Sequence, residues 1–470
     1  MRALLMLASS LLLAGCAAGG ESAENAISSK PNLVLIVADD LGYADVGFNG
    51  LEQFPTPHID RIANEGVRFT QGYVTHAVCG PSRAGMITGR YQDRFGSSIN
   101  PTVNPAVPNG VPRTERTLAE LLRAAGYESM AVGKWHLGTY PGLRPRERGF
   151  DEFYGFLSGG HDYFPENLTL EDLSEVRQKW GWYRTKVLHN GVRVSTDEYL
   201  TDELSSAAVE FIDRDRDRPF FLYLAYNAPH TPMQATGEKL REFSYIENER
   251  RRTYAGMVSS MDDGIGRVLD ALDRRRLAEN TVVVFLSDNG GARNNASRNT
   301  PLRGFKSDPY EGGVRVPFAI RWPAGFPAAA DYDRPVSSLD IAATIVAAAG
   351  PEASGALLPG KPLDGVDLRP FVRGLSDGRP HETLFWNWPN RGEIAGRSTD
   401  LKLVLRERGE DRRELFDLAG DPGESGNLAT LRAFEDRLAE LMEQIRAWES
   451  DMVPPAYPGL GSWNPGDRDG

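Results

Sequence analysis

The sequence predicts an α/β protein with a large, mainly parallel sheet flanked by helices, followed by a smaller C-terminal domain of antiparallel sheet plus helix. Strand-like apolar runs alternate with helix-like patterns through most of the 470 residues, as expected where helices connect parallel strands. Near residue 375 this alternation ends and short β-like stretches begin. Hydrophobic residues make up 40% of the chain and charged residues 25%, which allows a large buried core.

The first predicted strand, residues 32–38, is apolar throughout, which is typical of a strand covered on both faces. The further strands predicted for the large sheet are 129–132, 220–226, 281–286 and 316–321. In the C-terminal domain we predict β-like stretches at 383–388, 402–405 and 414–418 and an amphipathic helix at 431–448.

Helices between these strands are marked by capping residues. Thr56 and Pro57 predict a helix start, with Thr56 as the cap, and Gly66 predicts its end. Thr117 and Glu120 have the spacing of a capping box at the start of another helix. A helix rich in small residues is predicted at 341–349.

The N-terminus has the pattern of an export signal. Arg2 precedes an apolar run that is too short for a stable membrane span and ends in L-A-G-C at Cys16. This ending resembles the lipobox of bacterial lipoproteins, which implies a signal peptide at 1–15 and acylation of Cys16. A plain secretory signal cleaved nearby is the alternative. Residues 16–30, small and polar, would form a flexible tether, so we expect an exported protein anchored by lipid alone to a bacterial membrane, facing the periplasm or cell surface.

The charge pattern excludes one class of partner. The formal net charge is −12 and the chain has no block of Lys or Arg, which argues against binding to nucleic acid.

Acidic and amide side chains follow two predicted strands. Asp39 and Asp40 follow the first strand, and Asp288 and Asn289 follow the strand at 281–286. Ligands bind at the carboxyl ends of strands in open α/β sheets, where these oxygens would suit calcium or magnesium. Either pair alone is better explained as a turn or a helix cap. Both pairs at matching strand ends favour a metal site.

Cys79 is the only cysteine that remains after removal or acylation of the N-terminus, so it can form no disulfide within the chain. It begins the run C-G-P-S-R-A-G-M-I-T-G-R at 79–90. This run resembles the maturation signature of the type I sulfatases, in which the cysteine is oxidised to formylglycine. The alternative is a buried free cysteine, the common fate of cysteines in apolar surroundings.

Four further segments resemble the sulfatase family in the correct order. They are G-K-W-H-L-G (133–138), A-P-H-T-P (228–232), L-R-G-F-K (302–306) with E-G-G-V-R-V-P (311–317), and E-L-F-D-L (414–418) with D-P-G-E (421–424). Relatives often carry small residues around the lysine of the third segment, whereas this chain has Phe305 there. The resemblance implies an alkaline-phosphatase-like fold, with a catalytic domain at 31–375 and a C-terminal subdomain at 376–470.

The resemblance also assigns roles to residues. It implies catalysis by Cys79, Arg83, Lys134, His136, His230 and Lys306, and one Ca²⁺ held by Asp39, Asp40, Cys79, Asp288 and Asn289. Formylglycine at position 79, made by a formylglycine-generating enzyme, would be hydrated to a gem-diol. One hydroxyl would attack sulfur, and the second would allow the covalent intermediate to release sulfate. Arg83, one helical turn further on, would hold the diol.

The other side chains would act on the sulfate group. Lys134 and Lys306 would neutralise its oxygens, His136 would accept the proton of the second hydroxyl, and His230 would be the general acid with Lys306 beside it. Charge builds up on oxygens in such a transition state, which requires local cations. Because sulfated substrates are anions and the chain is acidic, the site must concentrate positive charge locally.

Residues 159–164 and 180–184 lie between these segments and are rich in aromatic side chains. Loops on a rigid scaffold often determine specificity. We therefore predict substrate contacts for His161 and Arg184, in addition to Lys134, His230 and Lys306. The alternative is that the aromatic side chains only pack this insertion.

The sequence thus favours a sulfatase acting on a sulfated poly- or oligosaccharide. Two alternatives remain. A phosphodiesterase or phosphonate hydrolase of the same superfamily would share the metal site. An inactive glycan-binding lipoprotein would show losses among the catalytic positions, and none is apparent.

Overall fold

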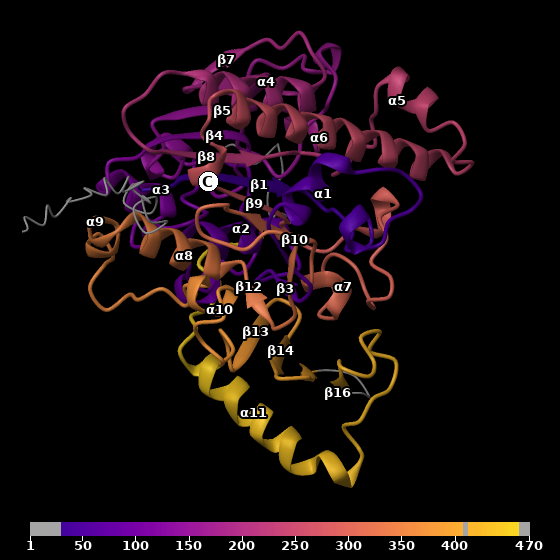
Figure 1. Ribbon diagram of the computed structural model, residues 1–470. Helices are drawn as coiled ribbons and strands as arrows, with labels where there is room; N and C mark the ends of the chain where they lie inside the picture. Colours follow the sequence, from indigo (N-terminus) through magenta and orange to yellow (C-terminus); the bar gives the residue numbers. More distant parts are fainter. Residues whose placement is uncertain (1–29, 408–411, 460–470) are drawn as a thin grey trace, which may run out of the picture.

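A large sheet crosses the middle of the molecule, with helices on both faces and a smaller sheet beside it (Figure 1). The computed structural model describes residues 30–407 and 412–459. The predicted signal peptide, Cys16 and the tether except for residue 30 lie outside the described residues. The large sheet consists of β1 (Asn32–Ala38), β2 (Val67–Phe69), β4 (Glu128–Lys134), β5 (Glu152–Phe156), β6 (Val187–His189), β7 (Val192–Val194), β8 (Phe220–Ala225), β9 (Thr281–Ser287), β10 (Phe318–Arg321) and β11 (Ala330–Tyr332).

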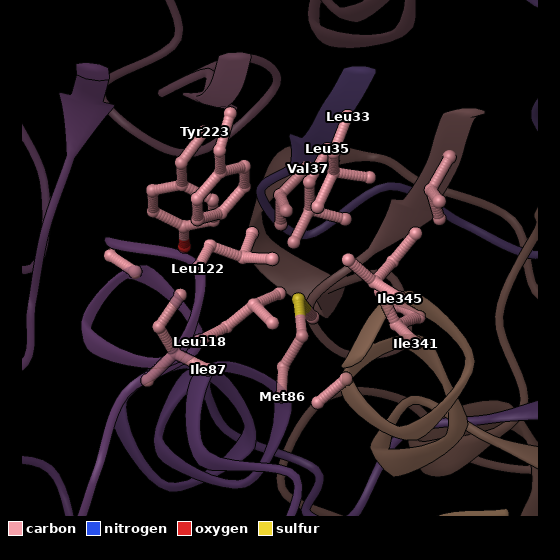
Figure 2. Packing of buried hydrophobic residues seen from close by; sticks show 14 of the residues in the cluster. Leu33, Leu35, Val37, Met86, Ile87, Leu118, Leu122, Tyr223, Ile341 and Ile345 are labelled. Atoms are coloured by element: carbon pink, nitrogen blue, oxygen red, sulfur yellow. The ribbon is translucent and has the colours of Figure 1, made fainter. Parts of the chain in front are cut away.

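Its strand order is β11-β2-β10-β9-β1-β8-β4-β5-β6-β7, and the five strands from β9 to β5 run parallel. The alternating side chains of β1 supply both faces. Leu33, Leu35 and Val37 belong to one hydrophobic cluster, and the residues that follow each of them belong to the other. Figure 2 shows the first cluster, where these side chains face Leu122 and Ile341 from the covering helices.

The edges of the large sheet are mostly antiparallel. The predicted strand at 316–321 is present as β10, and it pairs antiparallel with both β9 and β2. The chain returns from β9 to β10 by a loop that holds only the 3-10 helix η9 (Arg293–Asn295) and the four-residue helix α7 (Glu311–Val314). Two neighbouring strands can be parallel only if the connection between them crosses from one end of the sheet to the other. The connection from β9 to β10 stays at the end where β9 finishes, so β10 runs antiparallel to β9.

The helices form a layer on each face (Figure 1). One layer contains α1 (Pro57–Asn64), α4 (Leu200–Asp213) and α6 (Glu249–Arg274), and the other contains α2 (Cys79–Thr88), α3 (Leu118–Ala124), α8 (Leu339–Ala349) and α9 (Pro351–Gly355). The capping box of Thr117 and Glu120 is confirmed. Thr56 does not cap α1, because its hydroxyl accepts a bond from the backbone of Gly47 instead.

The C-terminal region forms a four-stranded antiparallel sheet with one long helix. Its elements are β13 (Thr383–Trp388), β14 (Glu393–Ser398), β15 (Leu401–Arg406), β16 (Arg413–Asp417) and α11 (Glu435–Ser450). The sequence pattern missed β14. Smaller elements elsewhere are β3 (Gly72–Tyr73), β12 (Val336–Ser337), α5 (Gly237–Glu242) and α10 (Arg369–Val372). Within the described ranges, no helix combines the length and the apolar character that spanning a membrane requires.

Candidate active site

Four neighbouring parallel strands end at the same edge of the sheet and bring most of the predicted site residues together. Asp39 and Asp40 follow β1, Asp288 and Asn289 follow β9, Lys134 ends β4 and precedes His136, and the chain leads from β8 to His230. All seven side chains are buried. The apolar strands place their first polar residues at the crevice where open α/β sheets bind ligands.

The carboxylates form the centre of this crevice. The potential ligand atoms of Asp39, Asp40, Cys79 and His230 lie within 4.8 Å of one another. Asp288 adjoins them, and its Oδ1 accepts a bond of 3.4 Å from the backbone N–H of Asp40. Burial acts to raise the pKa of Asp39, but the nearby charges, that of Lys134 above all, hold it well below its usual range. Asp39 is therefore ionised and available to a cation.

Two site residues have backbone angles that side-chain-bearing residues rarely adopt. The φ angle of Asp40 is 64° and that of His136 is 54°. Such left-handed conformations persist where the surrounding structure fixes them, and they are concentrated at functional sites.

Cys79 is the first residue of α2, and its thiol lies next to the carboxylates of Asp39 and Asp40. Its Sγ lies 3.5 Å from Asp39 Oδ1 and 3.0 Å from Lys306 Nζ. Burial, reinforced by the charge of Asp288, raises the pKa of this thiol to about 12. Because the thiolate is the nucleophilic form, an unmodified Cys79 is a weak nucleophile at neutral pH.

Arg83 lies one turn further along α2 and is fully buried. Its Nε donates a bond of 2.7 Å to Asp288 Oδ2, and its Nη1 donates to the backbone carbonyl of Lys134. Its Nη2 has no hydrogen-bond partner among the described residues and lies 3.9 Å from Asp39 Oδ2. Arg83 therefore fixes one carboxylate, and the N–H groups of its Nη2 have no hydrogen-bond partner among the described residues.

Two lysines place cations beside the carboxylates. Lys134 Nζ lies 2.5 Å from Asp39 Oδ2. Lys306, on the loop between β9 and β10, approaches Asp40 Oδ1 to 2.6 Å. Burial acts to lower the pKa of Lys306, but Asp40 and Cys79 raise it well above its ordinary value. Lys306 is therefore cationic, and it lies beside a carboxylate as Lys134 does.

The two histidines differ in their partners. Neither ring nitrogen of His136 has a hydrogen-bond partner in the described part of the chain. Burial and the charge of Lys134 hold the pKa of His136 far below its ordinary value, so the ring is neutral. His230 Nδ1 lies 2.6 Å from the Thr231 carbonyl, which leaves Nε2 facing Asp40 at 3.7 Å. Burial also lowers the pKa of His230.

The residues present fit a hard divalent cation and a modified residue 79. Asn289 Oδ1 is buried and has no hydrogen-bond partner among the described residues. With the carboxylates of Asp39, Asp40 and Asp288 it completes the oxygen donor set that calcium and magnesium prefer. The unpaired groups of Arg83 and His136 supply donors and acceptors beside residue 79.

A cavity of about 530 Å³ opens onto this crevice. Its lining includes Cys79, His136, His230 and Lys306, the aromatic residues Trp180, Trp182 and Tyr183, and Asn100, Gly159 and Asn294. The sequence pattern marked the two aromatic-rich segments, Gly159 among their residues, but missed Asn100 and Asn294. At Gly159, a Cβ atom would lie 2.8 Å from the His136 ring, so this close approach requires glycine.

Two predicted substrate contacts are not supported by the structure. His161 is fully buried, and its ring nitrogens lie 2.9 and 2.7 Å from the backbone carbonyls of Asp162 and Thr185. It therefore serves the fold of the insertion. Arg184 is exposed, donates to the Thr169 hydroxyl and does not line the cavity.

Comparisons with known proteins agree with this geometry. The family model for sulfatases matches residues 31–351, and a model described as N-sulphoglucosamine sulphohydrolase, C-terminal, matches residues 306–451. Human N-acetylgalactosamine-6-sulfatase is 31% identical over 475 residues, covering 92% of this chain and 88% of the relative. Human arylsulfatase A is 34% identical over 455 residues, covering 86% and 84%. The crystal structure of Ps i-CgsB in complex with k-i-k-neocarrahexaose has a TM-score of 0.84 and 38% identity, covering 91% of this chain and 95% of that one.

Proposed function

Because this chain belongs to the formylglycine-dependent sulfatases of the alkaline phosphatase superfamily, a family of sulfuric ester hydrolases, we propose that it removes sulfate from a sulfated oligo- or polysaccharide. One observation carries the proposal. The cavity combines reactive groups, Cys79, Lys306 and His230 among them, with a wall of aromatic side chains.

The proposal includes a bound metal ion and a modified amino acid. Asp39, Asp40, Asp288 and Asn289 would hold one Ca²⁺, with residue 79 beside them. Formylglycine derived from Cys79 would supply a hydrated aldehyde as nucleophile, and the cation would stabilise negative charge on the reacting oxygens.

The side chains of the chain itself would bind the sulfate and move protons. The ammonium groups of Lys134 and Lys306, now 2.5 and 2.6 Å from carboxylates, would neutralise sulfate oxygens. His136, neutral and without a partner among the described residues, would accept a proton beside residue 79. His230 would donate a proton from Nε2 to the leaving oxygen when its ring is doubly protonated, because the Nδ1 proton is held by the Thr231 carbonyl.

The aromatic wall favours a sugar as the rest of the substrate. The ring centroids of Trp180 and Trp182 are 5.2 Å apart, and the Tyr183 ring lies 6.5 Å from that of His230. The Trp180 residue is 47% exposed, so part of an apolar ring system is available to the C–H groups of a sugar ring. Two relatives are named for a carbohydrate sulfate or solved with a neocarrahexaose, which makes these glycans the first candidates.

The decisive experiment measures sulfate release from a panel of sulfated glycans and from a small aryl sulfate, and phenol release from a phenyl ester of a phosphonate. We expect release from at least one glycan and little phosphonate hydrolysis. Trp180→Ala should lower kcat/KM on that glycan by about tenfold and leave the aryl sulfate nearly unchanged. Turnover of phosphonate alone would favour the phosphonate hydrolase alternative.

We also propose that the chain is exported and anchored by lipid on Cys16, which rests on the L-A-G-C ending of the N-terminal apolar run. The wild-type protein should partition with membranes, and Cys16→Ser should release it into the soluble fraction. Wild-type protein found wholly in the soluble fraction would show that the lipobox prediction is wrong.

A further inference from the structure

Lys306 lies on a short, closed loop that is bonded to the C-terminal sheet. We call residues 303–311 the lysine loop. The loop is closed by the backbone N–H of Gly312, which donates 2.7 Å to the Arg303 carbonyl, and by the backbone N–H of Phe305, which donates to the Asp308 side chain. These bonds connect the loop's end at Glu311 with the part of the loop that carries Lys306.

The end of the lysine loop is bound to the C-terminal region by three fully buried charges. Glu311 Oε1 lies 3.0 Å from Nζ of Lys402 on β15, and the same Nζ lies 3.2 Å from Glu424 Oε1. Glu424 Oε2 in turn accepts a bond of 2.7 Å from the backbone N–H of Glu311. Each of the three side chains has no exposed surface.

A partly exposed second set of contacts surrounds this buried one. The Tyr310 hydroxyl donates 2.9 Å to Glu414 on β16 and accepts 2.6 Å from Arg406 on β15. Arg303 donates 2.9 Å to the backbone carbonyl of Glu424. Two residues at one end of the loop and one at the other are therefore tied to the C-terminal region.

The segment that leads to Cys79 rests on the same sheet. Trp386 Nε1, on β13, donates 2.7 Å to the Val74 carbonyl, and the Tyr73 hydroxyl donates 2.5 Å to Glu311 Oε2. The backbone N–H of Ser307 donates 2.8 Å to the carbonyl of Ala77, two residues before Cys79. The C-terminal sheet thus supports both segments whose side chains meet at 3.0 Å as Lys306 Nζ and Cys79 Sγ.

We propose that Lys402 and Glu424 are positioning residues that fix Lys306 in the sulfate pocket through Glu311. The inference rests on the sulfate-binding role proposed above for Lys306. Burying three charges is expensive, and apolar side chains of similar size often give equal or greater stability, so their stability alone does not explain the cluster. A buried charge cluster admits few arrangements, however, and this one sets the register of the lysine loop. A displacement of about 1 Å at a catalytic group is enough to lower rates by about a hundredfold.

The test is a double-mutant cycle between Lys402→Met and Lys306→Ala, read by kcat/KM on a small aryl sulfate and by calorimetric binding of inorganic sulfate. We expect Lys402→Met alone to lower kcat/KM and sulfate affinity about tenfold or more, and to have little further effect when Lys306 is already alanine. Lys402→Arg, which keeps the charge, should restore most of the loss. If the Lys402→Met protein does not fold, the same cycle can be measured with Glu424→Gln. This substitution preserves the size of the side chain and an oxygen that accepts the bond from the Glu311 N–H.

His381→Gln is the control for lost stability, because His381 bonds Asp340 on α8 at 2.7 Å. It should lower the melting temperature and leave kcat/KM unchanged. Equal losses from Lys402→Met in both backgrounds would show a structural role and overturn the inference. Full activity of Lys306→Ala would instead overturn the role of Lys306 itself, and the positioning proposal with it.

Discussion

Position 79 shows, at the scale of a residue, why the proposed chemistry depends on a covalent change. A cysteine offers one hydrogen, on a thiol whose pKa burial raises to about 12. A hydrated aldehyde offers two hydroxyl groups. The unpaired Nη2 of Arg83 and the two ring nitrogens of His136 suit two hydroxyls better than one thiol.

We therefore expect formylglycine at position 79 in active enzyme, detected by mass analysis of the tryptic peptide 69–83. Cys79→Ala should lower activity by about a thousandfold or more while the protein stays folded, because the nucleophile is lost. A fully active preparation whose peptide contained only cysteine would contradict this mechanism.

His161 should act through stability. His161→Ala removes a buried ring that contacts Phe156 at 4.8 Å between centroids and leaves the Thr185 carbonyl without its partner. We expect a loss of about 2–4 kcal/mol in the free energy of unfolding, measured by urea denaturation. The exposed Arg184→Ala should change it by about 0.5 kcal/mol or less. A His161→Ala protein of undiminished stability that lost activity only on glycans would restore the sequence-based prediction.

At the scale of elements, one side chain joins two helices of the same layer. Asp262 on α6 accepts bonds of 3.1 and 2.7 Å from the backbone N–H groups of His58 and Ile59 at the start of α1. It therefore supplies the cap that the sequence assigned to Thr56. Burial raises the pKa of Asp262 to about 7 despite these bonds.

This raised pKa predicts a pH dependence of stability. Between the ordinary value of 3.8 and about 7, the folded protein binds a proton that the unfolded chain has lost, so the free energy of unfolding falls as pH rises. Asp262→Asn removes this dependence and should gain stability relative to wild type across that interval. Urea denaturation from pH 4.5 to 8 measures the difference, with Asp263→Asn as the more exposed control. A difference that does not change with pH would refute the prediction.

The elements that could be predicted are those whose own sequences show that they are buried. The parallel strands of the centre are apolar on both faces, so their runs were recognisable. β14 was missed because it carries Glu393 and Arg397, two charged side chains whose partners lie in other segments. Glu393 pairs with Arg406 across the sheet, and Arg397 bonds Tyr73 far away in the chain. The orientation of β10 depends on the path of a loop that no local pattern describes.

At the scale of the whole molecule, an acidic protein has several basic side chains close together at one site. The net charge is −12, yet Lys134, Lys306 and Arg83 lie together at the crevice with three carboxylates. A bound divalent cation would further offset the repulsion among these carboxylates.

We therefore expect Ca²⁺ to stabilise the protein. Chelation should lower the melting temperature and abolish turnover, and added Ca²⁺ should raise the melting temperature with increasing concentration. Mg²⁺ should have a smaller effect, because an all-protein oxygen cage suits calcium. Asp288→Asn should weaken the Ca²⁺ response, whereas the exposed Asp331→Asn should not. A melting temperature that is insensitive to chelation and to Ca²⁺ would exclude the site.

The candidate site was predictable where short motifs carry the reacting groups. Motifs located the strand-end residues and Lys306, which the structure brings together. Asn100 and Asn294 come from loops whose approach to the cavity depends on tertiary packing, so no local signal marks them. Whether a histidine such as His161 lies in a cavity or inside the fold likewise depends on neighbours distant in sequence.

Cys79 is 2% exposed, and the segment before it is hydrogen-bonded to β13, which comes much later in the chain. During synthesis the run 79–90 leaves the ribosome long before β13 to β16 exist, and at that time it is an open peptide. In the folded protein this side chain is almost fully buried, so a modifying enzyme would have to reach it before the fold forms. The oxidation proposed for Cys79 would therefore precede folding, and the strands that support this segment come after it in the chain.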